Sequence, residues 1–146
     1  MICCLSLLLG VRALVSVPAD GLKLFNCNDG NRTKKTYANQ RWQIRDSSIV
    51  FEKTGGCINS VGEAAGSVLD VVACNPLCAS QQDWMLDQGK IRNGDMCLEA
   101  TANERTLTAQ PCSNSNISWK YDSSSAHLTT AGLCLDGGRA LSLIHI

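Results

Sequence analysis

The sequence lacks an excess of either charge. Of its 146 residues, 13 are Lys or Arg and 13 are Asp or Glu, so the formal net charge is zero. A chain without a general positive field is poorly suited to hold phosphate backbones or anionic lipid heads. The composition therefore argues against nucleic-acid and membrane-surface binding.

Long apolar runs are also missing. Residues 1–11 are apolar, but Arg12 ends the run before it is long enough to span a bilayer. Small residues at 17–19, followed by the polar Asp20, predict a cleavable secretory signal over residues 1–19. The alternative is a buried strand that follows an internal methionine of a longer chain. The apolar hexapeptide 141–146 breaks a polar texture and is expected to be a non-native tail, or else a closing strand, which leaves a domain at 20–140.

A catalytic constellation is missing as well. The only histidines are His127 and His145, and His145 lies in the expected non-native tail. Nucleophilic catalysis needs a base beside a serine or cysteine, and glycoside hydrolysis needs two carboxylates across a cleft. Cys74 and Cys78 have near-metal spacing, but no second close pair or histidine accompanies them, so a disulfide explains them better than zinc. We expect neither an enzyme nor a bound cofactor or metal.

Cysteine and glycine are plentiful. Nine cysteines in 15.7 kDa favour an oxidising compartment, and hence a secreted or extracellular protein. In such a protein the sequons that begin at Asn31 and Asn116 would be sites of N-glycosylation.

An internal repeat organises the rest of the chain. Tryptophan, aspartate and cysteine recur three times in the same order and at similar spacing: Trp42, Asp46 and Cys57; Trp84, Asp87 and Cys97; Trp119, Asp122 and Cys134. Strand-like runs at 48–52, 68–73 and 106–110 alternate with turn residues, and no segment after residue 20 has a helical period. The repeat predicts an all-β domain of three four-stranded lobes around a pseudo-threefold axis, with the tryptophans in the shared core.

Two tripeptides in this repeat, Gln40-Arg41-Trp42 and Gln82-Asp83-Trp84, carry a Gln-x-Trp signature, and the third copy is degraded to Ile117-Ser118-Trp119. Each lobe also carries a cysteine followed by an apolar and a polar residue, which end at Asn59, Glu99 and Asp136. With these motifs the chain resembles the ricin-type β-trefoil lectins over about residues 20–138. The resemblance implies a β-trefoil fold, binding of galactose or a related sugar, and frequent attachment to a glycosidase, glycosyltransferase or toxin.

On this resemblance we expect two disulfides, Cys57–Cys74 and Cys97–Cys112. The first lobe is split between the two ends of the chain, and three arrangements remain open. Cys27 could meet Cys134 in a permuted closure, Cys4 could pair with Cys27, or Cys134 could open a second trefoil. The expected non-native tail slightly favours the last two.

Sugar pockets of the family combine a carboxylate, an aromatic ring and an Asn-Gln pair, because hydroxyls need polar partners and the apolar face of a sugar stacks on a ring. No lobe carries a complete set within one stretch of sequence. The first lobe offers the most, and its carboxylate depends on the permuted closure. The candidate residues, lobe by lobe, are Phe25, Asn39, Gln40 and Asp136; Asn59, Asp70, Gln81 and Gln82; and Glu99 and Asn116.

We therefore predict a secreted carbohydrate-binding module whose partners are glycans or glycoproteins, alone or attached to a glycosidase or glycosyltransferase. The alternatives are a structural or protein-binding trefoil with decayed pockets and a fragment of an enzyme whose catalytic domain lies elsewhere.

Overall fold

The computed structural model describes residues 21–28, 34, 37–100 and 105–138. The expected signal peptide at 1–19, Cys4, the sequon at Asn31 and the expected tail at 141–146 lie outside the described residues.

Within these ranges the chain forms twelve short strands, one helical turn and three 3₁₀ helices. The strands are β1 (Lys23–Asn26), β2 (Trp42–Ile44), β3 (Ile49–Phe51), β4 (Cys57–Ser60), β5 (Ser67–Val72), β6 (Met85–Asp87), β7 (Lys90–Asn93), β8 (Met96–Ala100), β9 (Leu107–Pro111), β10 (Lys120–Asp122), β11 (His127–Thr130) and β12 (Leu133–Asp136). The helical elements are η2 (Tyr37–Gln40), η3 (Pro76–Cys78), α1 (Ala79–Gln82) and η4 (Cys112–Asn114). The three strands predicted from composition correspond to β3, β5 and β9.

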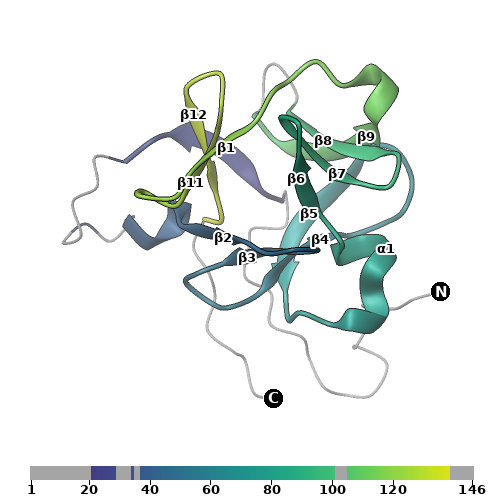
Figure 1. Ribbon diagram of the computed structural model, residues 1–146, viewed down its shortest axis with the longest axis horizontal. Helices are drawn as coiled ribbons and strands as arrows, with labels where there is room; N and C mark the ends of the chain where they lie inside the picture. Colours follow the sequence, from purple (N-terminus) through teal and green to yellow (C-terminus); the bar gives the residue numbers. More distant parts are fainter. Residues whose placement is uncertain (1–20, 29–33, 35–36, 101–104, 139–146) are drawn as a thin grey trace.

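The strands form three antiparallel lobes of four (Figure 1). The second lobe of the repeat contains β2 to β5 and the third contains β6 to β9, and these two join through pairing of β5 with β9. The first lobe has the strand order β1-β12-β11-β10, so it unites the start of the described chain with its end. Three four-stranded lobes about a common axis are the β-trefoil arrangement, which confirms the expected fold class.

Three leucines mark the pseudo-threefold axis. Leu22, Leu69 and Leu107 each lie five residues before the second cysteine of a lobe, and all three are buried. The Leu22 amide donates to the Leu69 carbonyl at 2.8 Å, and the Leu107 amide donates to the Leu22 carbonyl at 2.9 Å. The lobes therefore meet through their backbones at equivalent positions.

The three tryptophans of the repeat share one core. Trp42, Trp84 and Trp119 are at most 2% exposed and belong to a single buried cluster of apolar side chains. Each indole N–H donates to a backbone carbonyl, as a buried indole requires: that of Leu135, Gln81 and Leu98 respectively. The core is therefore assembled from all three repeats, none of which could bury its own apolar face alone.

Three disulfides fasten the lobes. Cys57–Cys74 and Cys97–Cys112 form as expected, each between a strand and the end of the next strand or the loop beyond it. Cys27 bonds to Cys134, with 107 residues of sequence separation. The arrangements with a Cys4–Cys27 bond or with a second trefoil after Cys134 are therefore wrong, because β1 pairs with β12 along its full length and brings these two cysteines together. The disulfide expected to involve Cys78 is also wrong, since Cys78 is a buried thiol.

Two glycines fix the backbone after β12. A Cβ on Gly137 would lie 2.5 Å from the ring of Phe51, so only glycine fits against this core side chain. Gly138 has a φ of +65°, in the left-handed region that glycine adopts without strain. Asp136 is thus held at the end of β12, immediately before a tight turn.

Candidate functional site

A cavity of about 460 Å³ lies where β1 meets β12. Phe25, Asn39, Gln40 and Asp136, the four candidates of the first lobe, all line it, together with Lys34 and three further residues. Phe25 comes from β1, Asp136 from β12, and the amide pair from η2. The permuted closure therefore brings Asp136 to three side chains from the other end of the chain, 96 residues away in the case of Gln40.

Gln40 holds the carboxylate of Asp136 in this cavity. The Nε2 atom of Gln40 donates to Asp136 Oδ2 at 3.0 Å and to the Asn26 carbonyl at 3.0 Å. Its Oε1 atom accepts from the Asn28 amide at 2.8 Å. Gln40 is only 3% exposed, and its side chain is hydrogen-bonded within the protein. The sequence had instead suggested that Gln40 binds a sugar hydroxyl directly.

The second oxygen of Asp136 is held by the turn that follows. The Gly138 amide donates to Oδ1 at 2.6 Å, which is the side-chain turn that aspartate favours at such positions. Burial raises the pKa of the Asp136 carboxyl above its ordinary value of 3.8, and the bonds from Gln40 and Gly138 and the charge of Lys53 oppose that rise. The carboxylate is therefore fixed in direction, and each of its oxygens retains a lone pair for a further donor.

Phe25 and Asn39 complete the rim of the cavity. Phe25 is 47% exposed although it is a large apolar side chain, and it lines the cavity from β1. The Asn39 carbonyl accepts from the Gly137 amide at 2.8 Å, which ties η2 to the turn after β12. The Oδ1 atom of Asn39 accepts from Lys53 Nζ at 2.8 Å, so its Nδ2 donors are the groups left for a ligand.

The second lobe repeats the backbone hydrogen bonds of this site but has different side chains at the equivalent positions. Gln82 donates to the Ala73 carbonyl and to Asn59 Oδ1, and accepts from the Asn75 amide at 2.8 Å. Asn59 stands where the first lobe has Asp136, and its Nδ2 donates to Asp70 Oδ1 at 2.9 Å. Gln81 is buried and donates to the Ser60 carbonyl. Asn59, Asp70 and Gln82 are therefore close together, while Val72 occupies the position of Phe25.

In the third lobe the candidate carboxylate, Glu99, is hydrogen-bonded to the neighbouring loop. Glu99 accepts from Ser115 Oγ at 2.9 Å through one oxygen and from the Asn116 amide at 2.7 Å through the other. Lys90 adds bonds to Ser115 Oγ and to the Ile117 carbonyl. The Asn116 side chain is exposed. In this lobe the carboxylate binds the loop that would otherwise border a pocket.

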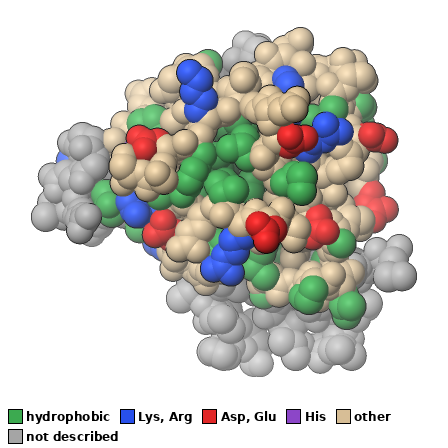
Figure 2. Space-filling view, viewed as in Figure 1, with side chains coloured by type: hydrophobic (Ala, Val, Ile, Leu, Met, Phe, Trp, Pro, Cys, Tyr) green, Lys and Arg blue, Asp and Glu red, His purple; other side chains and the backbone are tan. Residues whose placement is uncertain are grey.

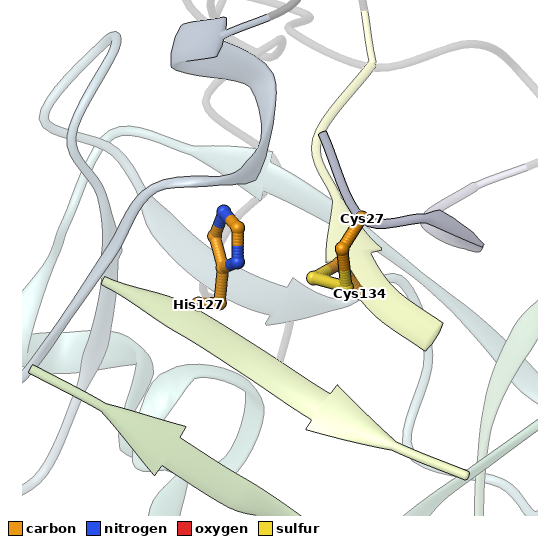
Figure 3. Close-up of side chains that lie close together, drawn as sticks. All are labelled: Cys27, His127 and Cys134. Carbon is orange, nitrogen blue, oxygen red and sulfur yellow. A yellow bond between two sulfur atoms is a disulfide. The ribbon is translucent and has the colours of Figure 1, made fainter. Parts of the chain in front are cut away.

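One cluster in the same region has the residue types of a metal site. Cys27, Cys134 and His127 of β11 lie with their ligand atoms within 4.8 Å of one another (Figure 3). The two sulfur atoms are bonded to each other, so neither is a thiolate that could hold a metal. Burial lowers the pKa of His127, which favours the neutral imidazole beside the disulfide.

The sequence did not identify the two lysines at this site. Lys34 lies in the loop before η2 and Lys53 in the turn after β3, and neither belongs to a motif. Only the path of the chain brings Lys53 to Asn39. Figure 2 shows acidic and basic side chains interspersed over one face of the molecule, so nothing in the overall charge singles these two out.

A β-trefoil with a carboxylate, an exposed ring and an amide around one surface cavity has the form of a carbohydrate-binding domain. The family model of the ricin-type beta-trefoil lectin domain matches residues 47–143, and the chain belongs to this family. Domains of this family are binding modules rather than catalytic ones, and membership implies carbohydrate binding. The match includes Asp136 but begins after Phe25, Asn39 and Gln40.

Comparisons with curated proteins and with solved structures gave no match. Among the helices in the described ranges, none has the length and apolar character needed to cross a bilayer.

Proposed function

We propose that the protein binds galactose or a related sugar in the cavity between β1 and β12. The observation that carries this proposal is the bond from Gln40 Nε2 to Asp136 Oδ2, which fixes a carboxylate in the cavity that the exposed ring of Phe25 also lines. Asp136 would accept hydrogen bonds from neighbouring sugar hydroxyls, and Asn39 would donate one through Nδ2. Phe25 would stack on the apolar face of the ring. Gln40 acts as a positioning residue.

The affinity of one such site is expected to be low, with a Kd on the order of 1 mM. Stacking supplies a large share of so small a free energy, so Phe25→Ala removes measurable binding. Phe25 is half exposed, and its loss leaves the buried core intact. Asp136→Asn also removes binding, because one acceptor oxygen becomes a donor.

Calorimetric titration with galactose and lactose tests the proposal. The matched control is Val61→Ala, which truncates another exposed apolar side chain, one that does not line the cavity. Wild-type and Val61→Ala proteins should bind alike, and Phe25→Ala should not bind. Binding that survives in Phe25→Ala would remove this cavity from consideration.

The other lobes support an additional proposal only weakly. The second lobe keeps Asn59, Asp70, Gln81 and Gln82 close together but offers no ring. In the third lobe Gln110 stands where the first lobe has Phe25, and Glu99 binds Ser115 and Asn116 of its own loop. We propose that Asn59 and Asp70 add weak sugar contacts at most, and that Glu99 and Asn116 add none. If the Phe25→Ala variant still binds sugar and the Asp70→Asn variant does not, the second lobe and not the first is the main sugar site.

We further propose that the domain is secreted, and that it serves as the carbohydrate-binding part of a glycosidase or glycosyltransferase. Three disulfides suit an oxidising compartment. The sequon at Asn116 places an exposed asparagine in the loop between η4 and β10, where a glycan could be attached. Expression with residues 1–19 in a eukaryotic host, followed by peptide mapping of the medium, tests both secretion and modification of Asn116.

A further inference from the structure

In two lobes the tryptophan motif that ends the lobe is hydrogen-bonded to the turn between the first two strands of that lobe. In the first lobe the Trp42 amide donates to the Ala126 carbonyl at 2.9 Å, in the turn between β10 and β11. In the third lobe the Trp119 amide donates to the Gly89 carbonyl at 2.7 Å, in the turn between β6 and β7. Each acceptor directly precedes the second strand of its lobe. These bonds hold the motif against the turn.

The second lobe lacks this bond. Ser48 holds the equivalent position, directly before β3. Its carbonyl accepts from the Arg45 amide at 2.9 Å, while the Trp84 amide donates to the Gln82 carbonyl at 2.8 Å. Asp83, between the last two residues, has φ −80° and ψ 63°, the conformation of an inverse γ-turn. The second motif therefore bonds within itself and not to the turn between β2 and β3.

A cavity of about 360 Å³ lies between these two segments. Ser47 and Ser48 line it from the turn, and Asp83 lines it from the motif. Pro76 and the Cys57–Cys74 disulfide add apolar surface. The volume is in the range of sites that bind small molecules or single side chains.

Other side chains reach the turn at the corresponding place in the first and third lobes. Arg41 holds the position of Asp83 in the first lobe, and its Nη1 atom donates to the Ser125 carbonyl at 3.1 Å. Ser118 holds it in the third lobe, where a Cβ on Gly89 of the turn would lie 2.8 Å from Ser118 Oγ. The second lobe therefore differs in having an acidic residue and a cavity at this place.

Asp83 is the only charged residue among those that line the cavity, and no described residue is hydrogen-bonded or ion-paired to its carboxylate. The hydroxyls of Ser47 and Ser48 also have no described partner, and each can donate or accept. Asn75 Oδ1 accepts from a backbone amide of η3 at 3.0 Å, which leaves its Nδ2 as a donor. Gln82 is bonded within the protein at both ends of its amide. An unpaired carboxylate beside hydroxyls favours a ligand with a positively charged donor.

We propose that this cavity is a second binding site, for a ligand that carries a primary ammonium group and an oxygen acceptor. The ammonium donates to the Asp83 carboxylate and to a serine hydroxyl, the oxygen accepts from Asn75 Nδ2, and C–H groups of the ligand contact Pro76. An amino sugar and a lysine side chain of a polypeptide both carry this chemistry. The site is separate from the cavity between β1 and β12 and does not depend on the proposed function.

NMR titration of isotopically labelled protein tests the inference with two pairs of probes. The pairs are galactosamine with N-acetylgalactosamine, and Nα-acetyl-lysine amide with its Nε-acetylated form, so each pair differs by one positive charge. At low ionic strength at least one ammonium probe should shift the amide signals of Ser47, Ser48 and Asp83. It should bind about fivefold more tightly than its acetylated partner, the effect of one exposed ion pair. The pair that shows this difference identifies the ligand as a sugar or a polypeptide side chain.

Variants assign the effect to Asp83. Asp83→Asn should abolish the difference within each pair, because it removes the only charge of the cavity. Asp83→Arg should remove binding of the ammonium probes, since it places here the side chain that the first lobe has in Arg41. The matched control is Asp95→Asn, which neutralises an exposed aspartate in the turn between β7 and β8, outside the cavity, and should leave the difference unchanged.

The failures are distinguishable. Equal affinity of each ammonium probe and its acetylated partner at low salt overturns this inference and leaves the proposed function standing. A difference that persists in either Asp83 variant overturns it as well, because the ammonium group then binds elsewhere. Lactose binding reports on the proposed function separately: Asp83→Asn should leave it unchanged, and a folded wild-type protein that does not bind lactose overturns the proposed function alone.

Discussion

Phe25 and Asp136 face one cavity from two neighbouring strands, and each stands two residues from a half of the same disulfide, Cys27–Cys134. Phe25 of β1 precedes Cys27, which follows that strand, and Asp136 follows Cys134 on β12. The covalent bond therefore fixes the spacing of the two groups on which sugar binding is proposed to depend.

Loss of this disulfide should cost more stability than loss of a short-range one. On the chain-entropy model, a loop of about 100 residues contributes about 4.7 kcal/mol and one of about 15 residues about 3 kcal/mol. Cys27→Ser with Cys134→Ser should therefore lower the free energy of unfolding more than Cys97→Ser with Cys112→Ser, where the separation is 15 residues. Urea denaturation of the two double variants measures this, and equal losses would contradict the entropic account.

Gln40→Ala and Gln82→Ala should destabilise the protein alike but differ in binding. Each glutamine bonds the two residues on either side of the second cysteine of its lobe, through one donated and one accepted backbone bond. Truncation leaves buried polar groups unpaired, at a cost of about 2–3 kcal/mol. Only Gln40 holds Asp136, so only Gln40→Ala should abolish sugar binding at a temperature where both variants are folded. Binding that is lost in Gln82→Ala and kept in Gln40→Ala would place the site in the second lobe.

Much of this architecture was predictable because the three copies of the repeat are constrained by the same core. Each tryptophan fills a shared interior, and the cysteine spacing sets two of the disulfides. The pairing of Cys27 with Cys134 was not decided by the sequence, because it depends on the register of β1 against β12 across the whole chain.

The site was harder to predict than the fold. The position of the motif identified Asn39 and Gln40 as candidates. It did not show that Gln40 is buried and positions Asp136 while Asn39 lies at the rim of the cavity, because that depends on which amide points inward. Lys53 carries no sequence signal at all: it reaches Asn39 because the hairpin of β2 and β3 places the turn after β3 next to η2. Such contacts follow from tertiary structure and not from local pattern.

Trp84→Ala should cost about 3–5 kcal/mol, as the truncation of large core side chains does. Trp84 is 1% exposed and is packed in the cluster built from all three lobes. Thermal and urea unfolding should show a large loss of stability in a single transition. An unchanged melting temperature would mean that this tryptophan is not a core residue.

Binding should depend on pH through Asp136. Burial raises the pKa of its carboxyl, so the protonated form persists to higher pH than in an ordinary aspartic acid of pKa 3.8. Sugar binding uses the ionised form, and affinity should therefore fall as pH is lowered through this raised pKa. Lys53→Gln removes a charge that lowers the pKa, so the loss of affinity should begin at still higher pH.

The stability of the unliganded protein should respond with the opposite sign. A carboxyl whose pKa is raised on folding binds its proton more tightly in the folded state. The stabilisation from that proton is present below the ordinary pKa and is lost as pH rises through the raised one. The Asp136→Asn variant should lack this part of the pH dependence, and unfolding curves compared with those of the wild type over the acidic range measure it.

The Cys27–Cys134 bond also determines how the domain bears mechanical load. A force applied at residues 21 and 138 passes through a few residues of β1, across the disulfide and out through β12, so the 107-residue interval between the cysteines carries no tension. When the disulfide is intact, pulling from these points extends only the short segments 21–27 and 134–138. A reduced domain could release roughly 350–390 Å of extended chain. The disulfide thus removes most of the trefoil from the load path, while Phe25 and Asp136 lie in the two short segments that carry the force, so tension would act directly on the proposed sugar site.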